Sequence, residues 1–309
     1  MEKDIISGLA QEPKSLPSKY FYDATGDALF QAIMDMPEYY LSRSEMDVFL
    51  HHAKDIVLTF DPKGFFEIIE LGAGDGTKTK VLINKWLEMG LDFSYVPIDI
   101  SKNVLQLLAA EFKKSFDNLR MTPVVGDYFH VLKDKKTSNN PKLVLFLGSN
   151  IGNLRGDNQA NFIQSLSDSL NPGDGLLIGF DLVKNPHTIL EAYNDKNGIT
   201  KQFNLNLLTR CNRELKTDFD LDNFSHYPIY DPERKEARSY LISMKKQVVT
   251  FPTSQLTITF EPGETIHTET SRKYTKADIE QLMTNANLKP SGWFYDCKHY
   301  FANVLSIKQ

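Results

Sequence analysis

The sequence predicts an α/β protein with a Rossmann-like sheet, and three observations support this prediction. Between residues 65 and 180, apolar runs of strand length alternate with helix-compatible segments. The run from Phe65 to Leu71 meets three glycines at alternate positions before a helix-compatible segment, Lys78 to Met89. The run from Lys142 to Leu147 is almost wholly apolar, as a central parallel strand should be.

The composition is that of a globular protein without a membrane segment. Of 309 residues, 41% are hydrophobic and 24% are charged, and the net charge of −5 argues against general nucleic-acid binding, which needs a basic surface. No apolar stretch approaches the roughly 18 residues needed to span a membrane. The N-terminus lacks the apolar region of a signal peptide. We therefore expect a cytoplasmic protein, monomeric, with neither a nucleic-acid nor a membrane partner.

The spacing of cysteines and histidines predicts no metal site. Cys211 and Cys297 form neither a disulfide framework nor a zinc pattern. His51 and His52 are adjacent, and the other five histidines are scattered. We interpret both cysteines as thiols without a catalytic role.

The glycine loop favours one class of cofactor. A dinucleotide-binding fingerprint would require glycine at position 77, where the sequence has Thr77. The observed pattern, Glu70-x-Gly72-x-Gly74-x-Gly76, resembles the first motif of class I S-adenosylmethionine-dependent methyltransferases. In that class the loop cradles the methionine part of the cofactor. The alternative is an ordinary glycine-rich turn between a strand and a helix.

An acidic residue ends the second predicted strand, Phe93–Ile98. At this position Asp99 can accept hydrogen bonds from both hydroxyls of a ribose. The alternative is that Asp99 caps the helix predicted at 102–116. Ser101 is the better cap for that helix, so we favour ribose binding.

A second acidic residue follows the third predicted strand, Met121–Val125. Asp127 can bind the amino group of an adenine, while the neighbouring Tyr128 packs on the base. Alternatively, Asp127 caps a turn. The glycine loop and Asp99 favour the adenine-binding interpretation.

Two further segments offer contacts to a zwitterionic substrate. The loop Gly148–Leu154 follows the strand 142–147, and an asparagine there supplies two donors and one acceptor. A turn asparagine without a ligand is the alternative. Tyr39 and Tyr40 are adjacent in a segment without periodicity, which fits either a lid over the substrate or core packing.

The remaining segments complete the expected layout. Helices are predicted at 28–36, 45–60, 161–170 and 275–286, and the stretch 184–240 is expected to be largely helical. Strand-like alternation occurs at 238–260, a fifth parallel strand at 176–180 ends at Asp181, and a terminal pair of strands is predicted at 292–295 and 300–307. A sheet of five parallel strands followed by a C-terminal hairpin is the layout that class I methyltransferases use.

A closer resemblance covers the chain from about Pro13 to its end. The segments KSLPSKYFYD, MPEYYLSR, ELGAGDGTKTK, FLGSNIGNL, GFDLVKNP, FNLNLLTRCNREL and GETIHTETSRKY occur in this order. Together they resemble the histidine-specific N-alpha-methyltransferases of ergothioneine biosynthesis. The resemblance implies transfer of methyl groups from S-adenosylmethionine to the α-amino nitrogen of L-histidine, giving the trimethylated betaine hercynine.

The resemblance also implies two domains. The S-adenosylmethionine-binding methyltransferase domain would comprise residues 47–183 and 273–309. An inserted α+β substrate-binding domain would comprise residues 1–46 and 184–272.

Individual residues take their roles from the same resemblance. Tyr39 matches the tyrosine nearest the reacting amine, and Asn153 the asparagine that holds the amine and carboxylate. Tyr193 matches the tyrosine that also binds the substrate carboxylate, and Glu269 and Ser271 match the residues that bind the imidazole. The cofactor would be bound by Gly72, Gly74, Lys78, Asp99, Asp127 and Tyr128.

Two positions depart from the family pattern and leave the substrate open. Ser239 stands where the family has a methionine beside the substrate, and Asn150 stands where a threonine is expected. The alternatives are the same reaction on an aromatic amino acid or a modified histidine, a nicotinamide-dependent oxidoreductase, and a protein that binds its ligands without catalysis.

The segment Thr268–Ser271 contains the residues that we expect to determine which amino-acid side chain the protein binds. Alternation along an extended segment sends Glu269 and Ser271 to the same side. A carboxylate accepts a hydrogen bond from an imidazole N–H, and a hydroxyl can serve the other nitrogen. The alternative for Glu269 is a salt bridge to Arg272 or Lys273.

Overall fold

The structure of the protein is a computed structural model that describes residues 1–126, 128–135, 140–154, 156 and 158–309. The chain divides into two compact units. Unit 1 comprises Met1–Tyr40 and Lys184–Arg272, and unit 2 comprises Leu41–Val183 and Lys273–Gln309. Each unit has its own sheet and its own core, and each is described by itself.

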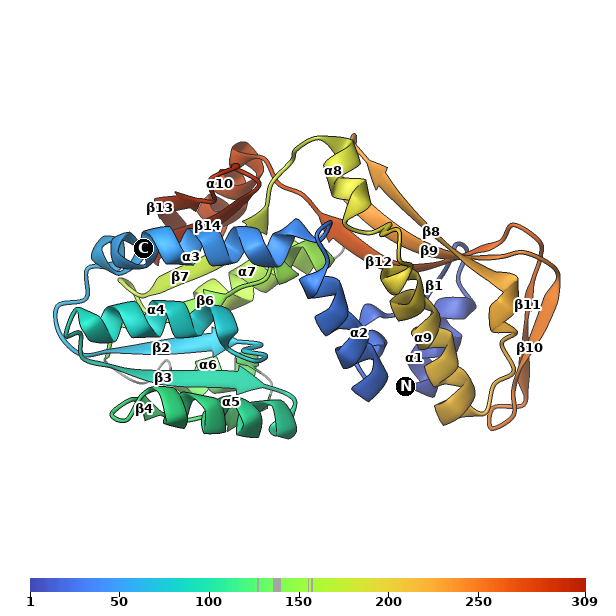
Figure 1. The fold of residues 1–309 in the computed structure, drawn as a ribbon, viewed down its shortest axis with the longest axis horizontal. Coiled ribbons are helices and arrows are strands. Elements are labelled where there is room, and N and C mark those ends of the chain that lie inside the picture. The colour runs from blue at the N-terminus through green and yellow to red at the C-terminus, as the bar shows by residue number, and fades with distance from the viewer. Residues whose placement is uncertain (127, 136–139, 155, 157) are drawn as a thin grey trace. The chain divides into compact units, whose positions relative to one another are not determined.

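Unit 2 is built around a mixed sheet (Figure 1). Its strands are β2 (Phe66–Leu71), β3 (Phe93–Asp99), β4 (Arg120–Met121), β5 (Val124–Val125), β6 (Lys142–Phe146), β7 (Gly175–Asp181), β13 (Leu288–Tyr295) and β14 (Phe301–Lys308). The order is β13-β14-β7-β6-β2-β3-β4, and β5 also pairs with β3. The strands from β7 to β4 are parallel, whereas β14 is antiparallel to β7 and β13 to β14. The carboxyl ends of the parallel strands therefore share one edge, where open α/β sheets bind ligands.

Helices cover both faces of the unit 2 sheet (Figure 1). One face carries α3 (Tyr40–Phe60), α4 (Thr77–Glu88) and α5 (Lys102–Ser115), whose buried residues include Phe49, Ile83 and Phe112. The other face carries α6 (Tyr128–Lys135), α7 (Asn158–Asp168) and α10 (Lys276–Asn285), whose buried residues include Leu132, Ile163 and Ile279. Because both faces are covered, β2, β6 and β7 are buried along their whole length.

Unit 1 contains a second, smaller mixed sheet of order β1-β12-β9-β8. Its strands are β1 (Lys14–Ser15), β8 (Phe224–Asp231), β9 (Glu236–Ser243) and β12 (Thr265–Arg272), and a separate hairpin consists of β10 (Gln247–Phe251) and β11 (Leu256–Phe260). Only β1 and β12 run parallel in this sheet.

The helices of unit 1 enclose its core. They are α1 (Glu2–Leu9), α2 (Ala24–Asp35), α8 (Pro186–Glu191) and α9 (Ile199–Leu215), with short 3₁₀ turns η1 (Ser18–Phe21) and η3 (Leu221–Asn223). Helix α9 packs against β8, β9 and α2. Its Phe203 and Leu207 join Ile33 of α2 and Leu241 of β9 in one apolar cluster.

Most predicted elements are confirmed with shifted ends. The five parallel strand positions and the C-terminal antiparallel pair are present, as are the helices predicted in the first 183 residues and at 275–286. The strand predicted at Met121–Val125 forms two short pieces, because Pro123 between them has no N–H to donate.

One prediction is wrong. The sequence pattern predicts that residues 184–240 are largely helical, yet the chain after α9 forms the strands β8 and β9. Aromatic and β-branched residues of β8, such as Tyr227 and Ile229, suit a strand that pairs with β9. Pro228 is tolerated because β8 lies at the edge of the sheet.

No helix in the described ranges combines the length and the apolar character needed to cross a membrane.

Candidate active site

The glycine loop joins β2 to α4 at the ligand-binding edge of the unit 2 sheet. Gly72, Gly74 and Gly76 have φ angles of 68°, 55° and 67°, a region that favours glycine. A Cβ atom on Gly72 or Gly74 would meet nothing within 4 Å, whereas on Gly76 it would lie 2.8 Å from Phe112 and 2.9 Å from Leu108. Gly72 and Gly74 therefore leave open space beside the backbone, while Gly76 allows the loop to pack on α5.

Asp99 lies against this loop. One carboxylate oxygen accepts a hydrogen bond from the Gly74 amide at 3.4 Å, and the other accepts one from the Ser101 amide at 2.9 Å. Ser101 caps α5, because its hydroxyl accepts a hydrogen bond from the Val104 amide at 3.3 Å. The predicted cap is thus confirmed, and the structure brings Asp99 next to the glycines.

The predicted adenine-binding pair is described only in part, because Asp127 lies outside the described residues. Tyr128 begins α6 and is partly buried. Its ring centroid lies 5.9 Å from that of Phe162, edge to face, and 5.0 Å from that of Phe129. Tyr128 is therefore held in an aromatic cluster on the face covered by α7.

Lys78, in the first turn of α4, pairs with Glu45 of α3. The Glu45 side chain is fully buried, and it also accepts hydrogen bonds from the amide of Gly148 and, at 3.0 Å, from the side chain of Asn303. Sequence reasoning missed Glu45, which it placed only at the start of an amphipathic helix. Nothing in that pattern indicates which acidic residue of the helix is buried.

The loop after β6 contains Gly148, Ser149 and the 3₁₀ turn η2 (Asn150–Asn153). Asn150 donates a hydrogen bond to the Leu147 carbonyl at 3.0 Å and so acts as a turn asparagine. Asn153, the last residue of η2, is half-buried. The Asn150 side chain is therefore engaged within the turn, and Asn153 is the asparagine predicted to contact the substrate.

Glu70, the first residue of the glycine pattern, is a buried acid with a structural role. It accepts hydrogen bonds from the Thr79 hydroxyl at 2.6 Å and from the Tyr95 hydroxyl. Burial raises the pKa of Glu70 to about 7, although these hydrogen bonds and the Lys78 charge oppose the shift. Glu70 thereby links β2 to both α4 and β3 behind the loop.

In unit 1, three predicted substrate contacts share one face of the sheet. Glu269 and Ser271 of β12 stand opposite Ser239 and Ala237 of β9. Cross-strand partners, and residues two apart, project to the same side. Ala237 and Ser239 are on the face that β9 buries. A β-bulge between His267 and Glu269 sets this register.

The hydroxyl of Ser239 is buried and has no hydrogen-bond partner within the described part of the chain. Its backbone carbonyl accepts a hydrogen bond from the Thr268 hydroxyl at 3.0 Å, and that hydroxyl also lies 2.6 Å from the Asn204 side chain. The backbone at Ser239 is therefore fixed while its own hydroxyl stays unsatisfied.

Tyr22 is a neighbour of Glu269 to which sequence reasoning gave no role. The pKa of its phenol is raised by burial and by the negative charges of Glu269 and Asp27. Tyr22 as a whole is 45% exposed, so burial of its phenol is incomplete. The nearby negative charges are therefore the cause that locates Tyr22 beside Glu269. Its ring lies 5.6 Å from Phe30 and 6.0 Å from Phe203, centroid to centroid.

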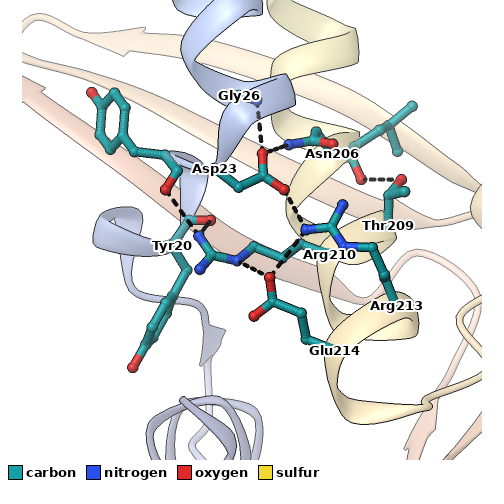
Figure 2. Close-up of polar contacts among 10 residues, drawn as sticks. Tyr20, Asp23, Gly26, Asn206, Thr209, Arg210, Arg213 and Glu214 are labelled. Carbon is teal, nitrogen blue, oxygen red and sulfur yellow. Dashed lines mark hydrogen bonds and ion pairs between the residues drawn. The ribbon is translucent and has the colours of Figure 1, made fainter. Parts of the chain in front are cut away.

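A polar network holds the segment that carries Tyr22 (Figure 2). Asp23 caps α2 by accepting a hydrogen bond from the Gly26 amide at 2.7 Å, and it also accepts one from Asn206 at 2.9 Å and pairs with Arg213 at 2.5 Å. Arg210 donates to the carbonyls of Tyr20 and Tyr22, both at 3.1 Å. These contacts tie the chain before α2 to α9.

The three predicted tyrosine positions differ in environment. Tyr40 is buried and accepts a hydrogen bond from Lys184 at 2.9 Å, which fits core packing. Tyr39 is half-buried, with its ring 6.4 Å from that of Phe30. Tyr193 follows α8 and is buried.

One group of side chains has the spacing of a metal site. Ligand atoms of Asp47, Asp296 and Cys297 lie within 4.8 Å of one another. The Asp296 carboxylate, however, accepts hydrogen bonds from the amides of Tyr300 and Phe301, and Asp47 accepts one from the Cys297 amide. These acids therefore brace the turn between β13 and β14.

The unit 2 residues fit the predicted cofactor. Gly72 and Gly74 open their backbone to a ligand, Asp99 offers carboxylate oxygens beside them, and Lys78 places an ammonium group at the same edge. These groups suit an adenosine ribose and an amino-acid carboxylate.

Comparisons with known proteins agree with this geometry. The family model described as "Histidine-specific methyltransferase, SAM-dependent" matches residues 1–308. The chain is 34% identical over 308 residues to a histidine N-alpha-methyltransferase of Mycolicibacterium smegmatis and 33% identical to one of Mycobacterium tuberculosis, covering 100% of this chain and 95% of each relative. It is 25% identical over 331 residues to an L-tryptophan methyltransferase of Psilocybe serbica, covering 98% and 91%. The chain thus belongs to the histidine-specific, S-adenosylmethionine-dependent methyltransferase family, and it is an S-adenosylmethionine-dependent N-methyltransferase of amino acids.

Proposed function

We propose that the protein methylates the α-amino nitrogen of free L-histidine up to the trimethylated betaine. The observation that carries this proposal is the shared face of Glu269 and Ser271 in the unit 1 sheet. A carboxylate and a hydroxyl on one face can serve the two nitrogens of an imidazole, one as acceptor and the other as donor. Relatives that cover the whole chain carry the name histidine N-alpha-methyltransferase.

The cofactor is proposed to bind to unit 2. When bound, S-adenosylmethionine supplies an activated methyl group on its sulfonium. Gly72 and Gly74 would accommodate it against the backbone, and Asp99 would accept hydrogen bonds from the ribose hydroxyls. Asp127 and Tyr128 are assigned to the adenine, and Lys78 to the carboxylate of the methionine part.

The backbone groups of the amino acid are assigned to three residues. The side-chain amide of Asn153 offers two donors and an acceptor, and the residue is half-buried in η2. Tyr193 is assigned to the carboxylate. Tyr39 is assigned to the reacting amine, which must lose a proton before each transfer and which a phenol can orient.

The two units are proposed to have different roles in the reaction. Unit 2 would be the S-adenosylmethionine-binding domain, and unit 1 would select the amino-acid side chain. The position of Ser239 beside Glu269 supports a second candidate, the same reaction on another amino acid. The family includes a relative named for L-tryptophan.

The test is a methylation assay of the purified protein across the twenty amino acids, read by mass spectrometry. Histidine is expected to gain up to three methyl groups and to react faster than tryptophan and phenylalanine. Faster methylation of an aromatic amino acid would establish the second candidate. No methyl gain on any amino acid would refute both.

A further inference from the structure

The buried carboxylate of Glu45 connects α3 to α4, to β14 and to the loop after β6. The Glu45 side chain is fully buried on α3. It pairs with Lys78 of α4, accepts hydrogen bonds from the Gly148 amide at 2.9 and 3.1 Å, and accepts one from Asn303 of β14 at 3.0 Å. An ionised carboxylate is stable in such a place only when it is paired and hydrogen-bonded in this way.

The strand β7 is shaped around the same carboxylate. A Cβ atom on Gly179 would lie 2.3 Å from a Glu45 carboxylate oxygen, so any larger residue would displace it. That oxygen accepts hydrogen bonds from the Gly148 amide and the Asn303 side chain, which would be lost if it moved. Glycine at this position is therefore a requirement of the Glu45 contact.

The Gly148 contact fixes a turn that is otherwise unfavourable. Gly148 and Ser149 have positive φ angles of 76° and 58°, and the second is unusual for a residue other than glycine. The Ser149 hydroxyl accepts a hydrogen bond from the Asp181 amide at 3.0 Å. Glu45 and Asp181 thus hold the two residues that lead into η2 and Asn153.

Lys78 is held beside the same turn. A Cβ atom on Gly148 would lie 3.7 Å from the Lys78 ammonium nitrogen. An ammonium group has three donors, and among the described residues Lys78 uses one of them, on Glu45. The side chain retains 26% exposure, so the other donors can reach a ligand.

We propose that Glu45 is the positioning residue that aims Lys78 at the cofactor and locks the turn leading to Asn153. This inference rests on the proposed cofactor role of Lys78. A lysine side chain has four rotatable bonds, and a fixed acceptor at its end limits the ammonium to one location. The Glu45 carboxylate thereby contacts both Lys78, which is assigned to the cofactor, and the loop that leads to Asn153, which is assigned to the amino acid.

The test is a double-mutant cycle of Glu45→Gln, Lys78→Met and the double variant. Glutamine keeps the shape of Glu45 but removes its charge. Calorimetric titration with S-adenosylhomocysteine is the readout. Glu45→Gln is expected to weaken binding about tenfold in the wild-type background, since a charge-assisted contact is lost, and less than about twofold in the Lys78→Met background.

The control variant is Asp174→Asn. Asp174 pairs with Lys142 at 3.2 Å, both side chains are almost fully buried, and Lys142 begins β6 whereas Gly148 follows its other end. Breaking this pair should lower the melting temperature as Glu45→Gln does, but it should leave affinity for S-adenosylhomocysteine unchanged.

Three results would overturn the inference: equal losses from Glu45→Gln in both backgrounds, unchanged or tighter binding in Glu45→Gln, and an equal loss in Asp174→Asn. Equal losses in both backgrounds, or an equal loss in Asp174→Asn, would make Glu45 a purely structural residue. Unchanged binding would mean that Glu45 does not position Lys78, and tighter binding would mean that it competes with the ligand for Lys78. Failure of the proposed function has a different signature, because the wild-type protein would then not bind S-adenosylhomocysteine or not methylate histidine.

Discussion

Ser239 of β9 lies directly opposite Glu269 of β12, and its buried hydroxyl makes no hydrogen bond to any residue that the structure describes. An unsatisfied buried hydroxyl destabilises a folded protein relative to an apolar group of the same shape. We therefore expect the Ser239 hydroxyl to take a hydrogen-bond partner from a ligand when one is bound. A substrate side chain held by Glu269 would supply one.

Ser239→Ala should stabilise the ligand-free protein and weaken histidine binding. We expect the free energy of unfolding to rise by about 1 kcal/mol, because the unpaired hydroxyl is removed. The matched control is Ser243→Ala on the same face of β9. Ser243 donates a hydrogen bond to the Lys245 carbonyl at 2.8 Å, so its loss should destabilise. Urea unfolding of both variants is the measurement, and equal destabilisation would show that Ser239 already has a partner.

Comparing Gly72→Ala with Gly76→Ala separates the effect of a methyl group on ligand binding from its effect on packing within the fold. Both residues have a positive φ near 67°, so alanine should cost about 1–2 kcal/mol of strain at either site. At Gly76 the new methyl group would also press on Phe112 and Leu108, which should add about 1–3 kcal/mol. Chemical unfolding should therefore show the larger loss for Gly76→Ala.

Cofactor binding should reverse that order. The methyl group of Gly72→Ala occupies the space assigned to the ligand, so affinity for S-adenosylhomocysteine, measured by calorimetry below the unfolding transition, should fall more in Gly72→Ala. Equal affinities in the two folded variants would show that Gly72 does not face the ligand.

The unit 2 sheet could be predicted because its information is local. Each of its signals, such as an apolar run, the glycine loop or the acid that ends β3, consists of a few neighbouring residues. The Ser101 cap is likewise a short-range signal. By contrast, Glu45 meets Gly148 and Asn303 across large sequence separations, and no periodicity indicates such a contact.

The unit 1 sheet shows a second limit. Alternation predicted that Glu269 and Ser271 share a side, but the bulge after His267 decides which side it is. Without that extra residue, Glu269 would stand opposite Arg238 and face away from Ser239. A bulge depends on pairing with β9, so the strand's own sequence does not reveal it.

Glu70→Gln should change how stability depends on pH. The pKa of Glu70 is raised from 4.5 to about 7, mainly by burial. The native state thus holds this proton more tightly than the unfolded chain does. The stability contributed by this group is present below pH 4.5 and is lost as the pH rises through 7. A shift of this size corresponds to about 3 kcal/mol.

The measurement compares urea unfolding of wild type and Glu70→Gln at pH 5 and pH 8. The stability of the variant relative to wild type should increase by up to about 3 kcal/mol at the higher pH. A constant difference between the two proteins would mean that Glu70 is ionised in the fold at both values.

Asp23→Ala should loosen the segment that carries Tyr22. The substitution removes the α2 cap, the hydrogen bond from Asn206 and the pair with Arg213 (Figure 2). We expect a loss of about 2 kcal/mol, mostly from the cap and the Asn206 bond, because Arg213 is half exposed. Asp23→Asn keeps the capping oxygen and should lose less than half as much. Thermal unfolding of both variants tests this, and similar losses would assign the effect to the ion pair.

Glu269→Ala should remove side-chain preference without affecting the cofactor. The lost acceptor leaves the imidazole N–H unpaired, which should weaken histidine binding by about 1–3 kcal/mol, or about 5- to 150-fold. Of the alternative partners considered for Glu269, Lys273 is engaged by Asp181 at 2.8 Å with both side chains fully buried. The pKa of the Tyr22 phenol is raised by burial and by the Glu269 charge, so this carboxylate lies near Tyr22.

The measurement is calorimetric titration of Glu269→Ala with histidine and, separately, with S-adenosylhomocysteine. The control is Glu264→Ala, which removes an acid from the loop before β12 that pairs with Lys14. It should leave both affinities unchanged. In Glu269→Ala only histidine should bind more weakly, because the groups assigned to the cofactor belong to unit 2. Phenylalanine, whose side chain has no N–H to donate to the carboxylate, should lose little. An equal loss for both ligands would show that Glu269 supports the fold and that the side chain is selected elsewhere.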